Sequence, residues 1–185
     1  MADENQFSVI ELSRLTWPSS LELPSKHFRL FVAADTTRVT TDELSDFAKA
    51  ALNAGMVYFC AWGSGCERFH DIVDWAVVED DLGERRFAGS TSNDTVMTTW
   101  HEDDSLEEAL DFFARLAIPS DGYASGSSYW LALSVGNPEW AAIAPNSSEQ
   151  PSLLAVIEAQ RIISSQLRLS ALPPALPHRR WEAGS

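Results

Sequence analysis

Two polar stretches hold most of the side chains that could do chemistry. One is residues 61–66, which ends at Cys66, and the other runs from His101 through Glu102 to Asp103. A cysteine paired with a histidine is the minimum set for nucleophilic catalysis, and a third group that orients the imidazole completes it. The residue types therefore suggest an enzyme with Cys66 as nucleophile and His101 as general base. In it, Glu102 or Asp103 is the partner of the histidine or a metal ligand.

Each of these residues also has a structural interpretation. Cys66 opens a run with helical periodicity, and a thiol at a helix N-terminus has a lowered pKa, but cysteine is also a common small core residue. The acids after His101 precede another helical run, where carboxylates suit the first amides and the helix dipole. The H-E-x-x-H zinc pattern is absent because Ser105 stands four residues after His101. The sequence therefore assigns no metal-binding motif and leaves the cofactor unknown.

The turn Gly63-Ser64-Gly65 and the tryptophans near it are further candidates for ligand binding. Backbone amides at such a turn can hold an anion at the start of a helix. The turn contains no lysine or arginine and matches neither the Walker nor the dinucleotide pattern, and a tight turn that needs glycine is the alternative. Trp62 and Trp100 flank the region, where they either stack on a planar ligand or fill the core.

The elements that position these residues follow from the alternation of two patterns. Strand-like apolar runs and helix-like periodic runs succeed one another along most of the chain. The strands are expected at 28–34, 56–61, 95–100 and 129–135, the helices at 40–54, 66–78, 105–118 and 152–169, and polar loops at 79–94 and 120–128. Thr40 with Glu43 and Ser105 with Glu108 form capping boxes, and Gly55 suits the position just past the first helix. The order predicts a three-layer α/β fold of the Rossmann or flavodoxin-like kind, with four or five mostly parallel strands and helices on both faces.

In open sheets of this kind, ligands bind beyond the carboxyl ends of the strands. The predicted strands end near Asp35, Cys66, His101 and Asn137. We therefore expect Asp35, the glycine turn with both tryptophans, and the cluster His101–Asp103 to share one edge of the sheet.

One domain with a flanking segment at each end is expected. The extension covers residues 1–26, the domain 27–169 and the tail 170–185. The extension is weakly periodic and is interpreted as lying on the domain through Trp17 and Leu21. The tail is proline-rich and flexible, and Pro174 to Arg179 matches the P-x-x-P-x-R pattern of SH3 ligands, a short match that occurs often by chance.

The chain is strongly acidic, with 27 Asp and Glu against 13 Lys and Arg and a net charge of −14 over 185 residues. Such a surface repels phosphate backbones and anionic membranes, so nucleic acid and membrane are disfavoured as partners. It favours a basic protein partner, because complementary fields speed encounter and select partners. No signal peptide is visible, no apolar run reaches about 18 residues, and Cys60 and Cys66 alone imply no disulfide framework. We therefore predict a cytoplasmic protein.

Residues 57–118 resemble a small uncharacterised family of bacterial α/β proteins. The resemblance rests on Ala61-Trp62-Gly63, then Cys66 with an aspartate-bearing helix, and then Val96 to Glu102, which reads V-M-T-T-W-H-E. That family has no assigned activity, so the resemblance implies a fold and the position of a site, and no reaction.

Two functions follow from these observations. The first is an acidic cytoplasmic protein-binding module, of an immunity or antitoxin-like kind, that engages a basic protein. The alternative is a small-ligand enzyme or sensor that uses Cys66, His101 and Glu102 at the carboxyl ends of the strands. The sequence leaves open whether the protein is an enzyme.

Overall fold

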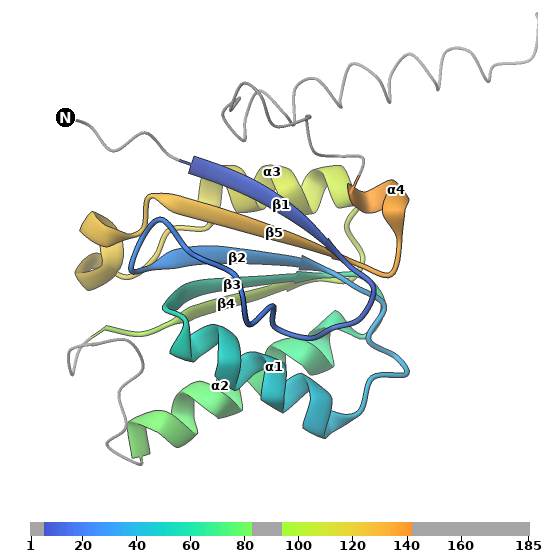
Figure 1. Cartoon of the computed structure of the whole chain (residues 1–185), viewed down its shortest axis with the longest axis horizontal. Coiled ribbons are helices and arrows are strands. Elements are labelled where there is room, and N and C mark those ends of the chain that lie inside the picture. Colours follow the sequence, from blue (N-terminus) through green and yellow to red (C-terminus); the bar gives the residue numbers. More distant parts are fainter. Residues whose placement is uncertain (1–5, 83–93, 142–185) are drawn as a thin grey trace, which may run out of the picture.

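A computed structural model of the chain describes residues 6–82 and 94–141. These residues form a five-stranded, fully parallel sheet with helices on both faces (Figure 1). The strands are β1 (Gln6–Leu12), β2 (Phe28–Ala33), β3 (Met56–Trp62), β4 (Met97–His101) and β5 (Tyr129–Val135). The helices are α1 (Thr41–Asn53), α2 (Cys66–Leu82), α3 (Leu106–Leu116), the short 3-10 helix η2 (Asp121–Gly126) and α4 (Pro138–Ala141). The predicted three-layer α/β fold is confirmed.

Strand order explains how the helices are shared between the faces. The order across the sheet is β1-β5-β2-β3-β4, so the last strand lies between the first two. α1 and α2 join β2, β3 and β4 stepwise and cover one face, and α3 returns the chain across the opposite face to β5 (Figure 1). The central strands β2, β3 and β5 are buried almost throughout, as continuous apolar runs in a parallel sheet predict.

Local signals place the first and third helices as predicted. The Thr40 and Ser105 side chains each accept the N3 amide, and Glu43 and Glu108 reach back to the cap amides, so both capping boxes form. Gly55 follows α1 with φ of +101°, and a Cβ there would lie 2.1 Å from a backbone oxygen of Lys26. Glycine is required at that position by both conformation and space.

Several predicted boundaries differ from the structure. α2 continues to Leu82 rather than ending near Val78, because the sequence holds no glycine or proline after Val78 until Gly83. The expected loop at 120–128 contains η2, and α4 follows β5 where no helix was predicted. The predicted helix at 152–169, the proline-rich tail and residues 83–93 of the predicted loop lie outside the described residues.

The predicted extension contains a strand that its sequence pattern did not indicate. Residues 6–12 form β1, which pairs only with β5 at the edge of the sheet, so its side chains are mostly half-buried and the apolar signal is weak. The segment 13–27 then connects β1 to β2 without a helix. Trp17 and Leu21 pack against the core, as predicted, and the ring of Trp17 lies 5.8 Å from that of Phe47 on α1.

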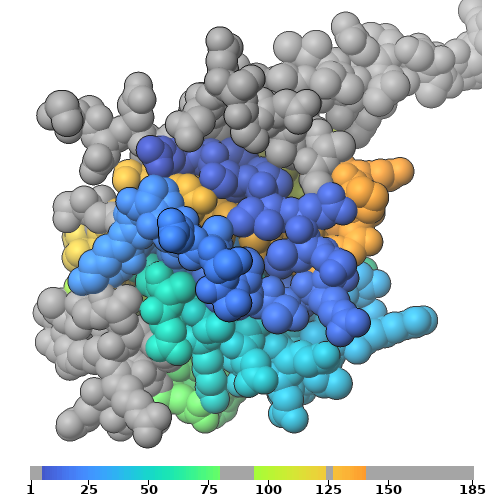
Figure 2. Space-filling view, viewed as in Figure 1, coloured from blue at the N-terminus to red at the C-terminus, as the bar shows by residue number. Residues whose placement is uncertain are grey.

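In the space-filling view, this N-terminal segment covers the face between the α1 region (cyan) and the α4 region (orange) (Figure 2). Its path matters for function because it brings polar residues from the start of the chain to the carboxyl edge of the sheet. Within the described residues, no helix is long and apolar enough to cross a membrane.

Candidate functional site

The chain leaves two neighbouring strands in opposite directions at the carboxyl edge of the sheet. After β2 it turns to the face of α1, whose Leu44 and Phe47 are part of one core cluster. After β5 it enters α4, whose Trp140 packs on the other core cluster with its ring 5.3 Å from that of Trp62. Such a divergence between adjacent parallel strands opens a crevice, and this is where ligands bind in open α/β sheets.

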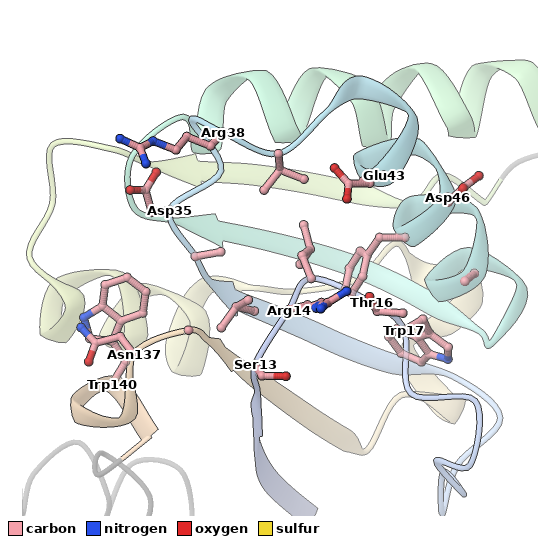
Figure 3. Close-up of a pocket in the computed structure, with 17 residues that line it drawn as sticks. Ser13, Arg14, Thr16, Trp17, Asp35, Arg38, Glu43, Asp46, Asn137 and Trp140 are labelled. Atoms are coloured by element: carbon pink, nitrogen blue, oxygen red, sulfur yellow. The ribbon is translucent and has the colours of Figure 1, made fainter.

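A pocket of about 760 Å³ occupies this crevice. It lies beyond the ends of β1, β5 and β2, and its volume is in the range of small-molecule sites. Its apolar lining is contributed by Leu15, Trp17, Ala34, Val39, Phe47, Ala50, Val135 and Trp140. Its polar lining is contributed by Ser13, Arg14, Thr16, Asp35, Arg38, Glu43, Asp46 and Asn137. Figure 3 shows these side chains arriving from four separate segments of the chain.

Two arginines on the pocket wall are not used by the described part of the fold. Arg14 follows β1 and Arg38 follows β2, and both are exposed. Neither guanidinium group makes a hydrogen bond or ion pair with another residue in 6–82 or 94–141. Their charges act at longer range, since, besides local hydrogen bonds, Arg38 lowers the pKa of Asp35 and Arg14 lowers that of Glu43. By contrast, Arg68 donates to two backbone oxygens and Arg115 pairs with Asp111 at 2.8 Å. The guanidinium groups of Arg14 and Arg38 are therefore available to a ligand, and planar guanidinium binds carboxylate or phosphate well.

The pocket also carries carboxylates, two of which support local structure. The Asp35 Oδ1 atom accepts hydrogen bonds from the hydroxyl and the amide of Thr37, at 2.6 and 3.0 Å. These bonds lower the pKa of Asp35, and nearby Arg38 adds to the effect. The Glu43 Oε2 atom accepts from the amide and hydroxyl of Thr40, and these bonds likewise lower the pKa of Glu43. Both carboxylates are therefore ionised at neutral pH.

Asp46 lies one turn after Glu43 on α1 and also lines the pocket. It is exposed, and its carboxylate makes no hydrogen bond or ion pair with another residue that the structure describes. The pocket wall therefore presents free groups of both signs, guanidinium from two loops and carboxylate from α1.

The predicted glycine turn holds the loop that carries Asp35 and Arg38. The amide of Thr36 donates to the Ser64 oxygen at 2.9 Å, and its hydroxyl donates to the Gly65 oxygen at 2.8 Å and contacts the Ser64 oxygen at 3.2 Å. Arg68, from the first turn of α2, donates to the backbone oxygens of Thr36 and Val39, each at 2.7 Å. These bonds fix one wall of the pocket.

Glycine at position 63 permits this close approach. Gly63 has φ of +107°, and a Cβ there would lie 2.5 Å from the Ala34 oxygen. The geometry thus accounts for the turn by its packing against the pocket loop, which is the tight-turn alternative of the sequence analysis. Gly63, Ser64 and Gly65 do not line the pocket themselves.

A second polar group lies at the ends of β3 and β4. Glu102 Oε1 accepts the amide of Gly65 at 3.0 Å, the Trp62 indole donates to the Asp104 backbone oxygen at 2.8 Å, and His101 Nδ1 lies 2.7 Å from Asp104 Oδ2. The predicted convergence of the two polar stretches is therefore present. The contacts of Glu102 and Trp62 join the turn after β3 to the turn after β4, so they stabilise the fold.

Trp100 and Asp103 stand apart from this group. The ring of Trp100 lies 4.5 Å from that of His70 on α2 and is 45% exposed. Asp103 is exposed on the turn after β4. Of the predicted ligand-binding residues, only Asp35 lines the pocket.

Cys66 begins α2, as predicted, and of its two interpretations the structure agrees with the packing residue rather than with the activated thiol. The side chain is buried, and burial raises the thiol pKa, with Glu102 raising it further. Hydrogen bonds from the backbone amides of His101 and Glu67 act in the other direction and are outweighed. The prediction of a lowered pKa was therefore wrong, because desolvation exceeds the helix-terminus effect here.

The thiol and the imidazole do not form a hydrogen-bonded pair. His101 uses Nδ1 toward Asp104, and its Nε2 is buried without a hydrogen-bond partner among the described residues. The ring packs on Phe112 at 4.5 Å between centroids. In the described part of the chain, no group of three or more His, Cys, Asp or Glu side chains is arranged to hold a metal ion.

Sequence reasoning missed the residues that make the pocket. Arg14, Thr16 and Trp17 lie in the segment interpreted as an extension, Glu43 was assigned to a capping box, and Arg38 and Asp46 were not singled out. Their one available signal was position, since Arg14 and Arg38 each follow a strand closely. That signal required recognition of β1.

One protein-family model matches residues 10–151, which is most of the chain. The family is described as a domain of unknown function, DUF7684. The chain belongs to this family. No curated protein and no solved structure gave a significant match. An uncharacterised domain family was expected from the sequence motifs, and the DUF7684 match is wider than the stretch 57–118 that carried them. It begins within β1 and includes every segment that lines the pocket.

Proposed function

We propose that this DUF7684 domain is a ligand-binding domain that takes a small polar molecule in the pocket between β1, β5 and β2. The observation that carries the proposal is the pair Arg14 and Arg38. Both face one pocket, at the divergence of β2 and β5, and the described fold leaves their guanidinium groups unpaired. In a chain with a net charge of −14, two such arginines at one place favour recognition of a negatively charged group.

Binding fits the geometry better than catalysis at the Cys66, His101 and Glu102 group. A nucleophile needs an accessible, activated atom and a base within hydrogen-bond reach. Here the thiol is buried with a raised pKa, and Glu102 holds the amide of Gly65. The pocket, in contrast, is lined by apolar side chains together with exposed polar and charged groups, and apolar surface with polar groups that fix the ligand is what a small-molecule site needs.

The test asks whether the purified protein carries a small molecule in this pocket. Protein prepared under native conditions is denatured, and the released compounds are identified by mass spectrometry. Ser13 is exposed on the pocket wall, so Ser13→Trp fills part of the space, whereas Ser20→Trp makes the same change outside the lining. We expect a compound that is released from wild type and Ser20→Trp and lost from Ser13→Trp.

The proposal fails if the wild type releases nothing and no compound in a broad metabolite panel raises its melting temperature. It also fails if the released compound is retained in full by Ser13→Trp. A folded-state control by circular dichroism separates loss of the pocket from loss of the fold.

A second function, binding of a basic protein, is supported by the outer face of α2. Trp75 is 70% exposed and Val78 is 46% exposed. Glu67, Asp71 and Asp74 are exposed or half-buried on the same helix. Exposed aromatic residues among charges are typical of protein interfaces, and the acidic surroundings select a basic partner.

Its test is capture of a partner from the native host at low and moderate salt. Trp75→Ala and Asp71→Lys should each weaken capture of a single basic protein, and salt should weaken it further. Glu22→Lys, an exposed acid on the β1–β2 segment, is the matched charge reversal. Equal loss with Glu22→Lys would show that only net charge matters, and equal capture by all variants would exclude the α2 surface.

A further inference from the structure

We infer that the pocket binds a small zwitterion with an apolar body, namely an α-amino acid or a short peptide that presents the same charged ends. This inference rests on the proposed function and names the ligand class of the same site. It follows from which charges line the pocket and from which of them the protein already uses.

The balance of charge on the wall disfavours ligands of one sign. Two guanidinium groups, of Arg14 and Arg38, face three carboxylates, of Asp35, Glu43 and Asp46. A phosphate would be attracted by the arginines but repelled by the carboxylates, and a simple cation would be repelled by the arginines. A ligand with one carboxylate and one ammonium group satisfies both signs, because like charges brought together are destabilising and opposite charges are favourable.

Local hydrogen bonds identify the groups that remain free for a ligand. One oxygen of Asp35 is held by Thr37, and one oxygen of Glu43 is held by Thr40. The Arg38 guanidinium and the Asp46 carboxylate make no hydrogen bond with a described residue, so their donor and acceptor atoms are available to a ligand, although the Arg38 charge also acts on Asp35. The structure assigns the ligand carboxylate to Arg38, with Arg14 on the facing segment, and the ligand ammonium group to Asp46.

The charged groups come from separate segments, and apolar side chains line the same pocket. Figure 3 shows Arg38 beyond the end of β2, Asp46 further along α1, and Arg14 on the segment after β1. Phe47, Val39 and Leu15 line the same pocket. The pocket volume of about 760 Å³ has room for a large apolar amino acid or a short peptide.

The experiment measures binding of related compounds by isothermal titration calorimetry. The probes are phenylalanine, leucine and the dipeptide Leu-Leu, with 3-phenylpropionate lacking the ammonium group and phenethylamine lacking the carboxylate. We expect at least one zwitterion to bind, and the probe that lacks either charged group to bind about tenfold or more weakly, as loss of a charged hydrogen bond predicts. Comparison of the amino acids with Leu-Leu distinguishes the two ligand sources.

Variants assign each charge to its partner. Arg38→Gln should weaken binding of the zwitterion and of 3-phenylpropionate by about ten- to hundredfold and leave binding of phenethylamine unchanged. Asp46→Asn should show the reverse pattern. Arg115→Gln on α3 and Glu22→Gln on the β1–β2 segment are matched controls outside the pocket and should bind as the wild type does.

The outcomes separate this inference from the proposed function. If a compound is released from the wild type and lost in Ser13→Trp but is not a zwitterion, and no zwitterionic probe binds, this inference is overturned and the ligand-binding function stands. If no compound binds at all, both are overturned. If the control variants lose binding as strongly as Arg38→Gln, the assignment of charges in the pocket is wrong.

Discussion

Replacing Thr36 with valine tests whether the glycine turn holds the pocket loop in place. Thr36 is 1% exposed, and its hydroxyl donates to the Gly65 oxygen at 2.8 Å. Valine has nearly the same shape and no donor. Both acceptor carbonyls keep another bond, because the Ser64 oxygen accepts the Thr36 amide and the Gly65 oxygen accepts the Phe69 amide. The loss should therefore stay near that of one buried hydrogen bond, about 1 to 2 kcal/mol of unfolding free energy.

Urea denaturation measures this loss directly. With a slope of about 2 kcal/mol per M, the middle of the usual range, the midpoint should fall by about 0.5 to 1 M while the slope is unchanged. Thr41→Val makes the same chemical change at an exposed helix position, where surface substitutions usually stay within about 0.5 kcal/mol. If Thr36→Val is as stable as Thr41→Val, the hydroxyl contributes nothing and the turn does not fix the pocket loop in this way. A ligand of the pocket should also bind Thr36→Val more weakly, since the loop carries Arg38.

Three further results are expected. Gly63→Ala should have a clearly lower melting temperature than Gly136→Ala. Both residues have positive φ, which costs alanine about 1 to 2 kcal/mol in either place, but of the two only position 136 has open space for the added Cβ. Equal melting temperatures would contradict this. Burial lowers the pKa of His27, so the unfolded state binds more protons between that lowered pKa and 6.5, and the free energy of unfolding should fall as pH drops through this window. His27→Phe should flatten that part of the curve of unfolding free energy against pH, and an unchanged curve would refute the assignment. Burial raises the pKa of Cys60 to about 12 and also raises that of Cys66, so iodoacetamide at about pH 8.5 should modify neither thiol until urea unfolds the chain. Rapid modification of either thiol in the folded protein, detected by mass spectrometry, would show that this cysteine is not buried.

The sheet was predictable where its signals are local. β2, β3 and β5 are buried on both faces, so each reads as a continuous apolar run, and the capping boxes of α1 and α3 need only four consecutive residues. β1 was not predicted, because an edge strand buries its residues only in part and its apolar signal is weak. Its alternating, half-polar pattern resembles that of an irregular segment.

The pocket was not predictable from the same patterns, since it depends on strand order. Asp35 and Asn137 were expected at the carboxyl edge, and both line the pocket. The partners that complete it, Arg14 above all, come from the β1–β2 connection. Only the insertion of β5 between β1 and β2 brings these segments together, and no single stretch of sequence encodes that order.

The direction of the Cys66 pKa shift illustrates a different limit. The helix start was read correctly, and the amides that favour a thiolate are present. The depth of burial, which the sequence does not give, decides the outcome against them.

The place of β5 in the sheet also bears on how the chain folds. In the described sheet β1 pairs with β5 alone, and the register joins Gln6 to Tyr129. β1 is synthesised before the other described strands and must therefore wait for β5, the last of them, before it has this partner, while β2, β3 and β4 can associate through short crossovers. Closing so long a loop late makes folding slow compared with that of folds rich in local contacts. The pocket walls come from β1, β2 and β5 together, so a ligand in that pocket would bind only the completed sheet and would stabilise the last step of folding.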